Sequence, residues 1–215
     1  MANPLASAWH QVRYAIDRTF KTGNRRHEFE HKYRKHGDYF GYEKKPYELT
    51  KYERTLALVK QWRTGSESAL EIGCSVGVFT AMIVPEFQHI TAVDIAGEAL
   101  ELTRKQTGDA KNVGYVQSDL LSLKLDRQFD VIFCAEVLMY IREKDAGEAC
   151  RVLDARLKPR GIIIEVSQQD RLSGRPKFFH GWDAVLGQYF EVAHRERFDD
   201  PERPYEIIAY RRRQG

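Results

Sequence analysis

From Ser68 onward, short apolar segments alternate with segments of helical periodicity, and this alternation constrains the fold more than any other feature of the sequence. Apolar strands separated by helices form a parallel sheet whose two faces are covered by the helices. Segment 129–134 is apolar on both faces, as a central parallel strand should be. The expected strands are 69–72, 89–95, 113–117, 129–134 and 161–166, and the expected helices are 78–84, 97–106, 145–157 and 182–189.

The end of the chain departs from this alternation. Two further strands, 190–197 and 205–211, are separated only by a turn at 199–202. Consecutive strands without an intervening helix form an antiparallel hairpin at an edge of the sheet. We therefore predict a Rossmann-like α/β fold, with a seven-stranded, mostly parallel sheet, an antiparallel C-terminal hairpin and helices on both faces.

Residues ahead of the first strand are expected to form a separate layer. Residues 6–36 look helical but polar, residues 39–42 read as an aromatic-rich loop, and Pro46 is expected to open a helix that runs through Trp62 until Gly65 stops it. We predict that residues 1–45 are a helical extension that caps the functional site, and that residues 46–215 are the main domain.

Composition excludes several classes of protein. The chain is 42% hydrophobic and 30% charged, which is too apolar for a disordered protein, and no apolar run is long enough to span a membrane. The N-terminus lacks the features of a secretion signal. The three widely spaced cysteines predict neither a metal site nor a disulfide framework, so we expect a cytoplasmic protein without a bound metal or a membrane partner.

The turn after the first expected strand, Glu71 to Gly77, is the first candidate site. Glycines there allow a tight turn and close approach of a ligand to the backbone. The segment fails the dinucleotide-binding pattern, which requires glycines where Ser75 and Val78 stand. It does satisfy the nucleophile elbow of serine hydrolases, with Ser75 as nucleophile, and this alternative stays open. Against it, Asp130, the acid such a triad would need, lies at the wrong end of its strand.

Acidic residues end the next two strands. Asp94 at the end of the second strand can accept both hydroxyls of an adenosine ribose, because two parallel acceptors match a cis-diol. Asp119 follows the third strand and can accept from the adenine amine, with Ile95 and Leu120 as apolar faces around the ring. The loop has no lysine for a phosphate. These features together favour S-adenosylmethionine, with S-adenosylhomocysteine as the product.

The chemistry is expected at the end of the fourth strand. Glu136 lies there and can hold the methionine ammonium or accept a proton from the substrate, and His180 is the second candidate base. We hypothesise in-line attack of a substrate nitrogen or oxygen on the methyl group, with the protein contributing alignment and desolvation.

At this point the sequence resembles the class I methyltransferases, and among them the nodulation protein S type, which N-methylates the deacetylated end of a chitooligosaccharide. The class pattern is carried by residues 70–80, 92–95, 117–120, 129–140 and 157–161, and the narrower one by 37–40, 46–48, 71–74 and 135–141. The resemblance implies that Phe40 and Tyr47 lie over the cofactor as a lid. The expected cofactor contacts are therefore Phe40, Tyr47, Glu71, Gly73, Cys74, Ser75, Gly77, Asp94, Ile95, Asp119, Leu120 and Glu136.

Two features depart from the family pattern. Ser75 replaces the middle glycine of the common loop, and Phe40 stands where a tryptophan is expected. The expected function is transfer of a methyl group to a small-molecule or saccharide acceptor. Two alternatives remain besides the hydrolase: a non-catalytic S-adenosylmethionine-binding module, and an RNA methyltransferase using the basic residues near the N-terminus. The net charge of +3 does not require a nucleic-acid partner. The Asn/Asp-Pro-Pro-aromatic motif, typical of enzymes that methylate the amines of nucleic-acid bases, is missing after the fourth strand.

Overall fold

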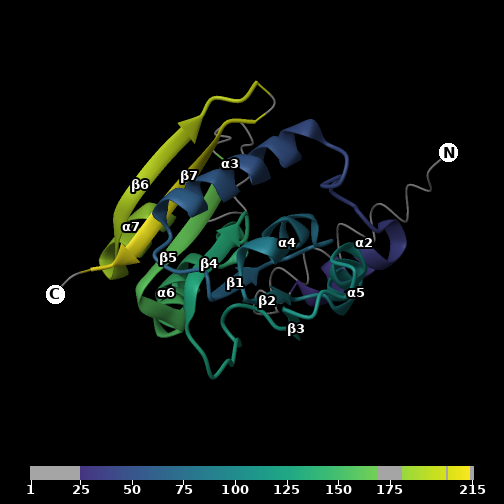
Figure 1. Ribbon diagram of the computed structural model, residues 1–215, viewed down its shortest axis with the longest axis horizontal. Helices are drawn as coiled ribbons and strands as arrows, with labels where there is room; N and C mark the ends of the chain where they lie inside the picture. The colour runs from purple at the N-terminus through teal and green to yellow at the C-terminus, as the bar shows by residue number, and fades with distance from the viewer. Residues whose placement is uncertain (1–24, 169–180, 202, 214–215) are drawn as a thin grey trace.

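The structure is a computed structural model, and it describes residues 25–168, 181–201 and 203–213. Seven strands form one sheet in the order β3-β2-β1-β4-β5-β7-β6 (Figure 1). The strands are β1 Ser68–Ile72, β2 His89–Asp94, β3 Val113–Gln117, β4 Phe129–Ala135, β5 Leu157–Gln168, β6 Phe190–Phe198 and β7 Tyr205–Arg212. The helices are α2 Arg26–His36, α3 Pro46–Trp62, α4 Val78–Ile83, α5 Gly97–Gln106, α6 Ala146–Arg156 and α7 Trp182–Tyr189, with short 3-10 turns at Val84–Glu86, Leu138–Tyr140 and Glu143–Asp145.

Strand pairing confirms the predicted fold class. Strands β1 to β5 pair in parallel, whereas β7 lies antiparallel between β5 and β6. The order in which strands are added to the sheet reverses between β1 and β4. Strands β2 and β3 lie on one side of β1, whereas β4 and β5 lie on its other side. Ligands of such sheets bind beyond the carboxyl ends of the strands at this reversal.

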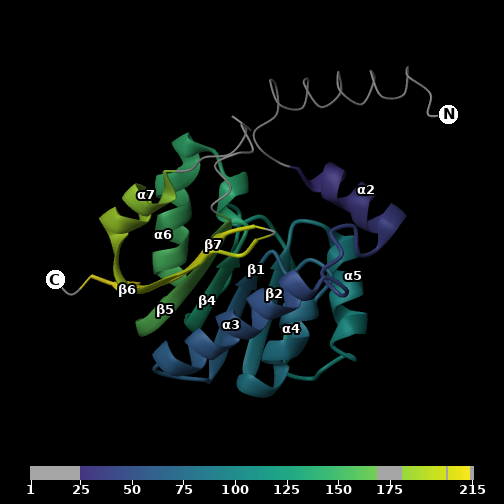
Figure 2. The same cartoon turned by 90° about the horizontal axis from the view of Figure 1, so that it is seen from above.

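Two apolar layers hold helices to the sheet, because successive residues of a strand face opposite sides. Ala69 and Val131 pack with Val59 of α3 and Phe79 of α4 on one face. The next residues along the strands, such as Leu70 and Ile132, pack with α6 and α7 on the other face. Figure 2 shows α3 and α4 on one side of the sheet and α6 and α7 on the other. Among the described residues, no helix combines the length and apolar character needed to cross a membrane.

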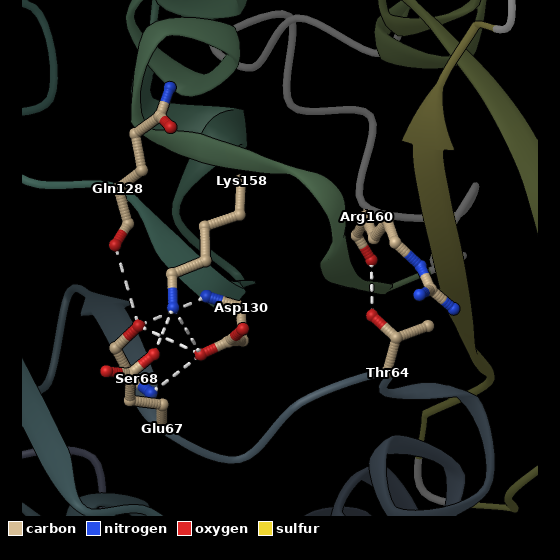
Figure 3. Close-up of polar contacts among 7 residues, drawn as sticks. All are labelled: Thr64, Glu67, Ser68, Gln128, Asp130, Lys158 and Arg160. Carbon is tan, nitrogen blue, oxygen red and sulfur yellow. Dashed lines mark hydrogen bonds and ion pairs between the residues drawn. The ribbon is translucent and has the colours of Figure 1, made fainter.

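A polar cluster fastens the amino-terminal ends of the central strands (Figure 3). Asp130 at the start of β4 accepts hydrogen bonds from the Ser68 backbone N–H at 2.8 Å and from Lys158 Nζ at 3.1 Å, and Lys158 also pairs with Glu67 at 2.7 Å. These contacts join β1, β4 and β5 at the edge opposite the carboxyl ends. Asp130 is therefore occupied far from the glycine loop, which removes it as the acid of a hydrolase triad.

Helix α2 belongs to the predicted helical extension, of which residues 1–24 lie outside the described part. Its Glu30 accepts hydrogen bonds from the backbone N–H groups of Gly97 at 2.8 Å and Glu98 at 3.2 Å, and so caps the first turn of α5. Arg34 adds an ion pair with Glu98 at 2.8 Å. The extension is thereby attached to the helix that follows β2, close to the predicted adenosine site.

Strand β5 begins earlier than the sequence pattern predicts. We expected the preceding helix to reach Leu157 and the strand to begin at Gly161, with Pro159 separating them. Instead Leu157 already pairs with Phe129, and the register then shifts before the pair Val131–Ile162. Pro159 lies within this irregular stretch, where its missing N–H costs no regular ladder hydrogen bond.

Candidate functional site

A cavity of about 840 Å³ lies at the carboxyl ends of β1 to β4. That volume is within the range of small-molecule sites. Eight of the predicted site residues line it: Phe40, Gly73, Ser75, Asp94, Ile95, Asp119, Leu120 and Glu136. Four others, Tyr47, Glu71, Cys74 and Gly77, are not part of its lining. The second candidate base, His180, lies outside the described residues.

The two glycines of the loop have different roles. Gly73 lines the cavity with a φ of +79°, and a Cβ there would clash with Val137 Cγ2, so only glycine fits. Gly77 also has a positive φ, +82°, but a Cβ on it would lie 2.6 Å from Thr103 Cα of α5. Glycine at position 77 therefore allows α4 and α5 to pack closely, and its contact with the cofactor stays a prediction. Cys74 also contacts α5, because its Sγ lies 3.4 Å from Thr103 Oγ1.

Ser75 adopts the left-handed backbone conformation that usually favours glycine, with a φ of +54°. Three hydrogen bonds hold it there. Its N–H donates to Asp94 Oδ2 at 3.0 Å, its carbonyl accepts from Thr103 Oγ1 at 2.9 Å, and its Oγ accepts from the Tyr33 hydroxyl at 2.9 Å. The partner of the serine hydroxyl is thus a tyrosine rather than a histidine, and the hydrolase alternative loses its support.

Asp94 is only 6% exposed and lines the cavity. Its Oδ1 accepts from the Ala96 N–H at 2.9 Å and its Oδ2 from the Ser75 N–H at 3.0 Å. Burial raises the pKa of Asp94 to about 6, against the lowering effect of these backbone hydrogen bonds. A carboxylate oxygen has two lone pairs, so each can also accept a ligand hydroxyl. Asp119 lines the same cavity, and its Oδ1 accepts from the Ser122 N–H at 2.9 Å.

Glu71 lies in β1, beneath the loop rather than in the cavity, and is 5% exposed. Its Oε2 accepts a hydrogen bond from Thr80 Oγ1 at 2.6 Å. Burial raises the pKa of Glu71 to about 7, and the hydrogen bond opposes this rise only in part. Glu71 therefore supports the loop from inside and is not part of the cavity lining.

Glu136 belongs to an ion cluster that the sequence patterns did not indicate. Lys51 Nζ lies 2.5 Å from Glu136 Oε1 and 2.7 Å from Glu48 Oε2. Desolvation lowers the pKa of Lys51, but the charges of Glu136 and Glu48 outweigh it and hold that pKa above its ordinary value. Glu48 and Glu136 both line the cavity. The i,i+3 spacing of Glu48 and Lys51 was the available signal, although on most helices it marks a solvated pair.

Tyr47 does not form the predicted lid. Its ring packs edge-on against Tyr205, with 5.8 Å between the centroids, and Lys51 Nζ lies 5.1 Å from its centroid. Position 47 follows Pro46 in the first turn of α3, which points this side chain into the core between α3 and the sheet.

The aromatic roof of the cavity comes instead from the extension. Phe29, Tyr33 and Phe40 line the cavity and form a cluster with centroid separations of 6.3 to 6.5 Å, and Phe29 meets Tyr140 edge-on at 5.5 Å. The sequence patterns indicated Phe40 but not Phe29 or Tyr33. Their spacing of four residues, which places both on one helix face, was the signal that a polar overall pattern obscured.

Comparison with known proteins identifies the family. The model of the family described as nodulation protein S matches residues 23–196. Nodulation protein S of Bradyrhizobium diazoefficiens is 33% identical over 147 residues, which cover 67% of this chain and 69% of that protein. Nodulation protein S of Rhizobium tropici is 30% identical over 126 residues, or 58% of this chain and 53% of that protein.

A solved structure shares the fold. It is the N-methyltransferase NodS from Bradyrhizobium japonicum WM9 in complex with S-adenosylhomocysteine, with a TM-score of 0.79 and 21% identity over 89% of this chain and 100% of that chain. The family match, the sequence relatives and the shared fold agree. The chain belongs to the nodulation protein S family of class I S-adenosylmethionine-dependent methyltransferases.

Proposed function

We propose that this methyltransferase transfers its methyl group to an amine nitrogen of a small-molecule or saccharide acceptor that enters the cavity beside Glu136. The observation that carries the proposal is a single cavity lined by Gly73, Asp94 and Asp119 from successive strand ends and also by the carboxylates of Glu48 and Glu136. The name of the Bradyrhizobium japonicum WM9 protein as an N-methyltransferase supports nitrogen as the target atom.

The residues present fit S-adenosylmethionine. The proposed assignments are Asp94 for the ribose hydroxyls, Asp119 for the adenine amine, Ile95 and Leu120 for the faces of that ring, and Gly73 for the methionine portion. Only a glycine leaves room at position 73, and the buried Asp94 carboxylate faces the cavity. When bound, the cofactor supplies a methyl group already activated by a sulfonium charge.

The chain's own residues exclude water and manage protons. Phe29, Tyr33 and Phe40 cover the cavity, which supports the assignment of residues 1–45 as a cap. An alkylammonium has a pKa near 10, as in lysine, and must lose a proton before it can attack. Glu136 is the proposed acceptor of that proton, with His180 as the second candidate. The three free, buried cysteines support a reducing compartment such as the cytoplasm.

A methyl-transfer assay tests this function. The protein is incubated with isotope-labelled S-adenosylmethionine and a glucosamine tetramer, with the fully N-acetylated tetramer as the matched control. Mass spectrometry should show one added methyl group on the amine-bearing tetramer and none on the control. Equal labelling of both tetramers would place the methyl group on a hydroxyl and refute the amine assignment.

The role of Glu136 has its own test. Replacing Glu136 with glutamine should lower turnover by about 10² to 10⁴-fold, as expected for loss of a proton acceptor. Affinity for S-adenosylhomocysteine, measured by calorimetry, should stay within about twofold of wild type because the cofactor contacts assigned above remain. A variant that loses cofactor affinity while keeping its turnover would exclude Glu136 as a base.

A further inference from the structure

The ion cluster of Glu48, Lys51 and Glu136 carries an unbalanced charge inside the protein. Lys51 is 2% exposed and Glu48 is 3% exposed. Two carboxylates share one ammonium, and in the described part of the chain Lys51 is the ion-pair partner of both. The cluster therefore has a net charge of −1 wherever all three groups are ionised.

An unbalanced buried charge is costly, because the interior cannot replace the solvation that water provides. Charged groups held in this way beside a cleft are candidates for a functional site, and here a ligand of opposite sign would balance the charge. Both carboxylates line the cavity, whereas Lys51 lies behind them and is not part of the lining. The negative side of the cluster thus faces the ligand space. Arg203 also lines the cavity and its charge acts on the neighbouring Tyr47, but no ion pair within 4 Å joins it to either carboxylate among the described residues.

The backbone holds Glu136 in a particular place. Its φ of +55° is in the left-handed region, which is unusual for glutamate. Its N–H donates to the Val166 carbonyl at 2.8 Å and so fixes the turn after β4 against β5. Glu48, in the first turn of α3, pairs with the same Lys51 ammonium at 2.7 Å. Two separate elements therefore deliver carboxylates to one spot, with Lys51 holding them together.

We propose that Glu48 and Glu136, held by Lys51, form the subsite for the acceptor nitrogen, and that this subsite selects a cationic alkylammonium over a neutral hydroxyl. The inference rests on the proposed function and deepens it. Glu48 is assigned a direct contact with the substrate, and Lys51 is a positioning residue.

Charge movement explains how such a subsite assists the reaction. One proton of the bound ammonium passes to Glu136, and the freed nitrogen lone pair forms the new N–C bond. The S–C bond breaks, and its electron pair stays on sulfur. Positive charge thus moves from sulfur to nitrogen, and the remaining negative charge of Glu48 lies where the positive charge arrives. Electrostatic stabilisation placed where charge develops lowers the barrier.

The main competing role for Glu48 is to hold the methionine ammonium of the cofactor. Two cofactor analogues separate these roles without an acceptor. S-Adenosylhomocysteine and sinefungin share the methionine ammonium, but sinefungin carries an additional amine where the transferable methyl group would be. A negative subsite for the acceptor nitrogen should therefore favour sinefungin, and the ratio of the two affinities reports on it.

The experiment measures both affinities by calorimetry at pH 7.5 for the wild-type protein, Glu48→Gln and the matched control Glu53→Gln, an exposed carboxylate on the same helix. Glu48→Gln should reduce the preference for sinefungin about tenfold or more, as expected when a unit charge is removed a few ångströms away. Its affinity for S-adenosylhomocysteine should stay within about twofold of wild type, and Glu53→Gln should change neither value.

Two results would overturn the proposal. If Glu48→Gln weakens both ligands equally, Glu48 holds the cofactor's ammonium; if it weakens neither, Glu48 does not act at this position. Failure of the wild-type protein to bind S-adenosylhomocysteine would instead refute the proposed function itself. Thermal melting of each variant establishes that it is folded.

The positioning role of Lys51 has a separate readout. In Lys51→Met the preference for sinefungin over S-adenosylhomocysteine should fall, because two adjacent carboxylates without their shared cation repel each other and disfavour the fully charged subsite. Lys51→Arg, which keeps the cation, should restore the preference. An unchanged preference in Lys51→Met would contradict this role.

Discussion

Replacing Glu71 with glutamine should stabilise the protein above neutral pH. Glu71 is buried in β1, and its carboxylate has a hydrogen bond from Thr80 Oγ1 at 2.6 Å. Glutamine has nearly the same shape, and its amide oxygen can accept the same bond. It removes the charge that has to be buried when Glu71 ionises, and it replaces one carboxylate oxygen with an amide NH2 whose effect is the same at every pH.

The size of the effect follows from the pKa of Glu71. Burial raises it from 4.5 to about 7. The folded state therefore binds more protons than the unfolded chain between pH 4.5 and 7, and the wild-type protein loses stability as pH rises through this window. The two pKa values differ by about 2.5, and one pKa unit is worth about 1.4 kcal/mol, so the loss above pH 7 is about 3 kcal/mol.

Urea denaturation at pH 5 and pH 9 measures this difference. The free energy of unfolding of Glu71→Gln, relative to wild type, should increase by about 2 to 3 kcal/mol between the two pH values. Glu101→Gln, an exposed carboxylate on α5, serves as control and should show no such increase. If Glu71→Gln gains no more stability at pH 9 than at pH 5, the assigned cost of ionising Glu71 is wrong.

Three further predictions concern the cavity. Asp94→Asn should weaken S-adenosylhomocysteine binding by about 10 to 100-fold in calorimetry, and wild-type affinity should fall as pH drops below about 6, where the buried carboxyl takes up a proton. Gly73→Ala should destabilise the protein by about 2 kcal/mol or more in urea, whereas Gly187→Ala in α7, where a Cβ meets nothing within 4 Å, should be neutral or slightly stabilising. Lys51→Met should lower the free energy of unfolding by about 3 to 5 kcal/mol in urea, because it leaves two adjacent carboxylates without their shared cation, whereas Lys51→Arg should recover much of this loss; equal losses in the two variants would argue for lost packing instead.

Local patterns predicted most of the fold. Helix α5 and strand β3 begin and end where the sequence indicates, because each is a short segment of clear periodicity between polar turns. The positions of Asp94 and Asp119 followed from topology alone, since parallel strands bring their carboxyl ends to one edge of the sheet. Hydrophobic pattern and sheet topology together therefore locate the cavity and the strand-end residues that line it.

The rest of the site depends on tertiary contacts that no local pattern records. Glu48 and Lys51 form an i,i+3 pair that usually faces solvent, and only the docking of α3 buries them beside Glu136. Tyr33 reaches Ser75 across 42 positions of sequence. The resemblance to the family suggested a lid at Tyr47, but the first turn of α3 directs that side chain into the core. Such contacts are set by how whole elements pack, and periodicity carries no information about that.

The order of synthesis adds a consequence for the ion cluster. Lys51 and Glu48 leave the ribosome before any strand of the sheet, and Glu136 follows Lys51 by 85 positions. A chain interrupted before β4 can pair Lys51 only with Glu48, because Glu136 has not yet been made. Long sequence separations of this kind make contacts form late in folding. The proposed acceptor subsite is thus completed only when β4 and β5 have paired and α3 has packed beside them, so its formation reports on the folding of this part of the sheet.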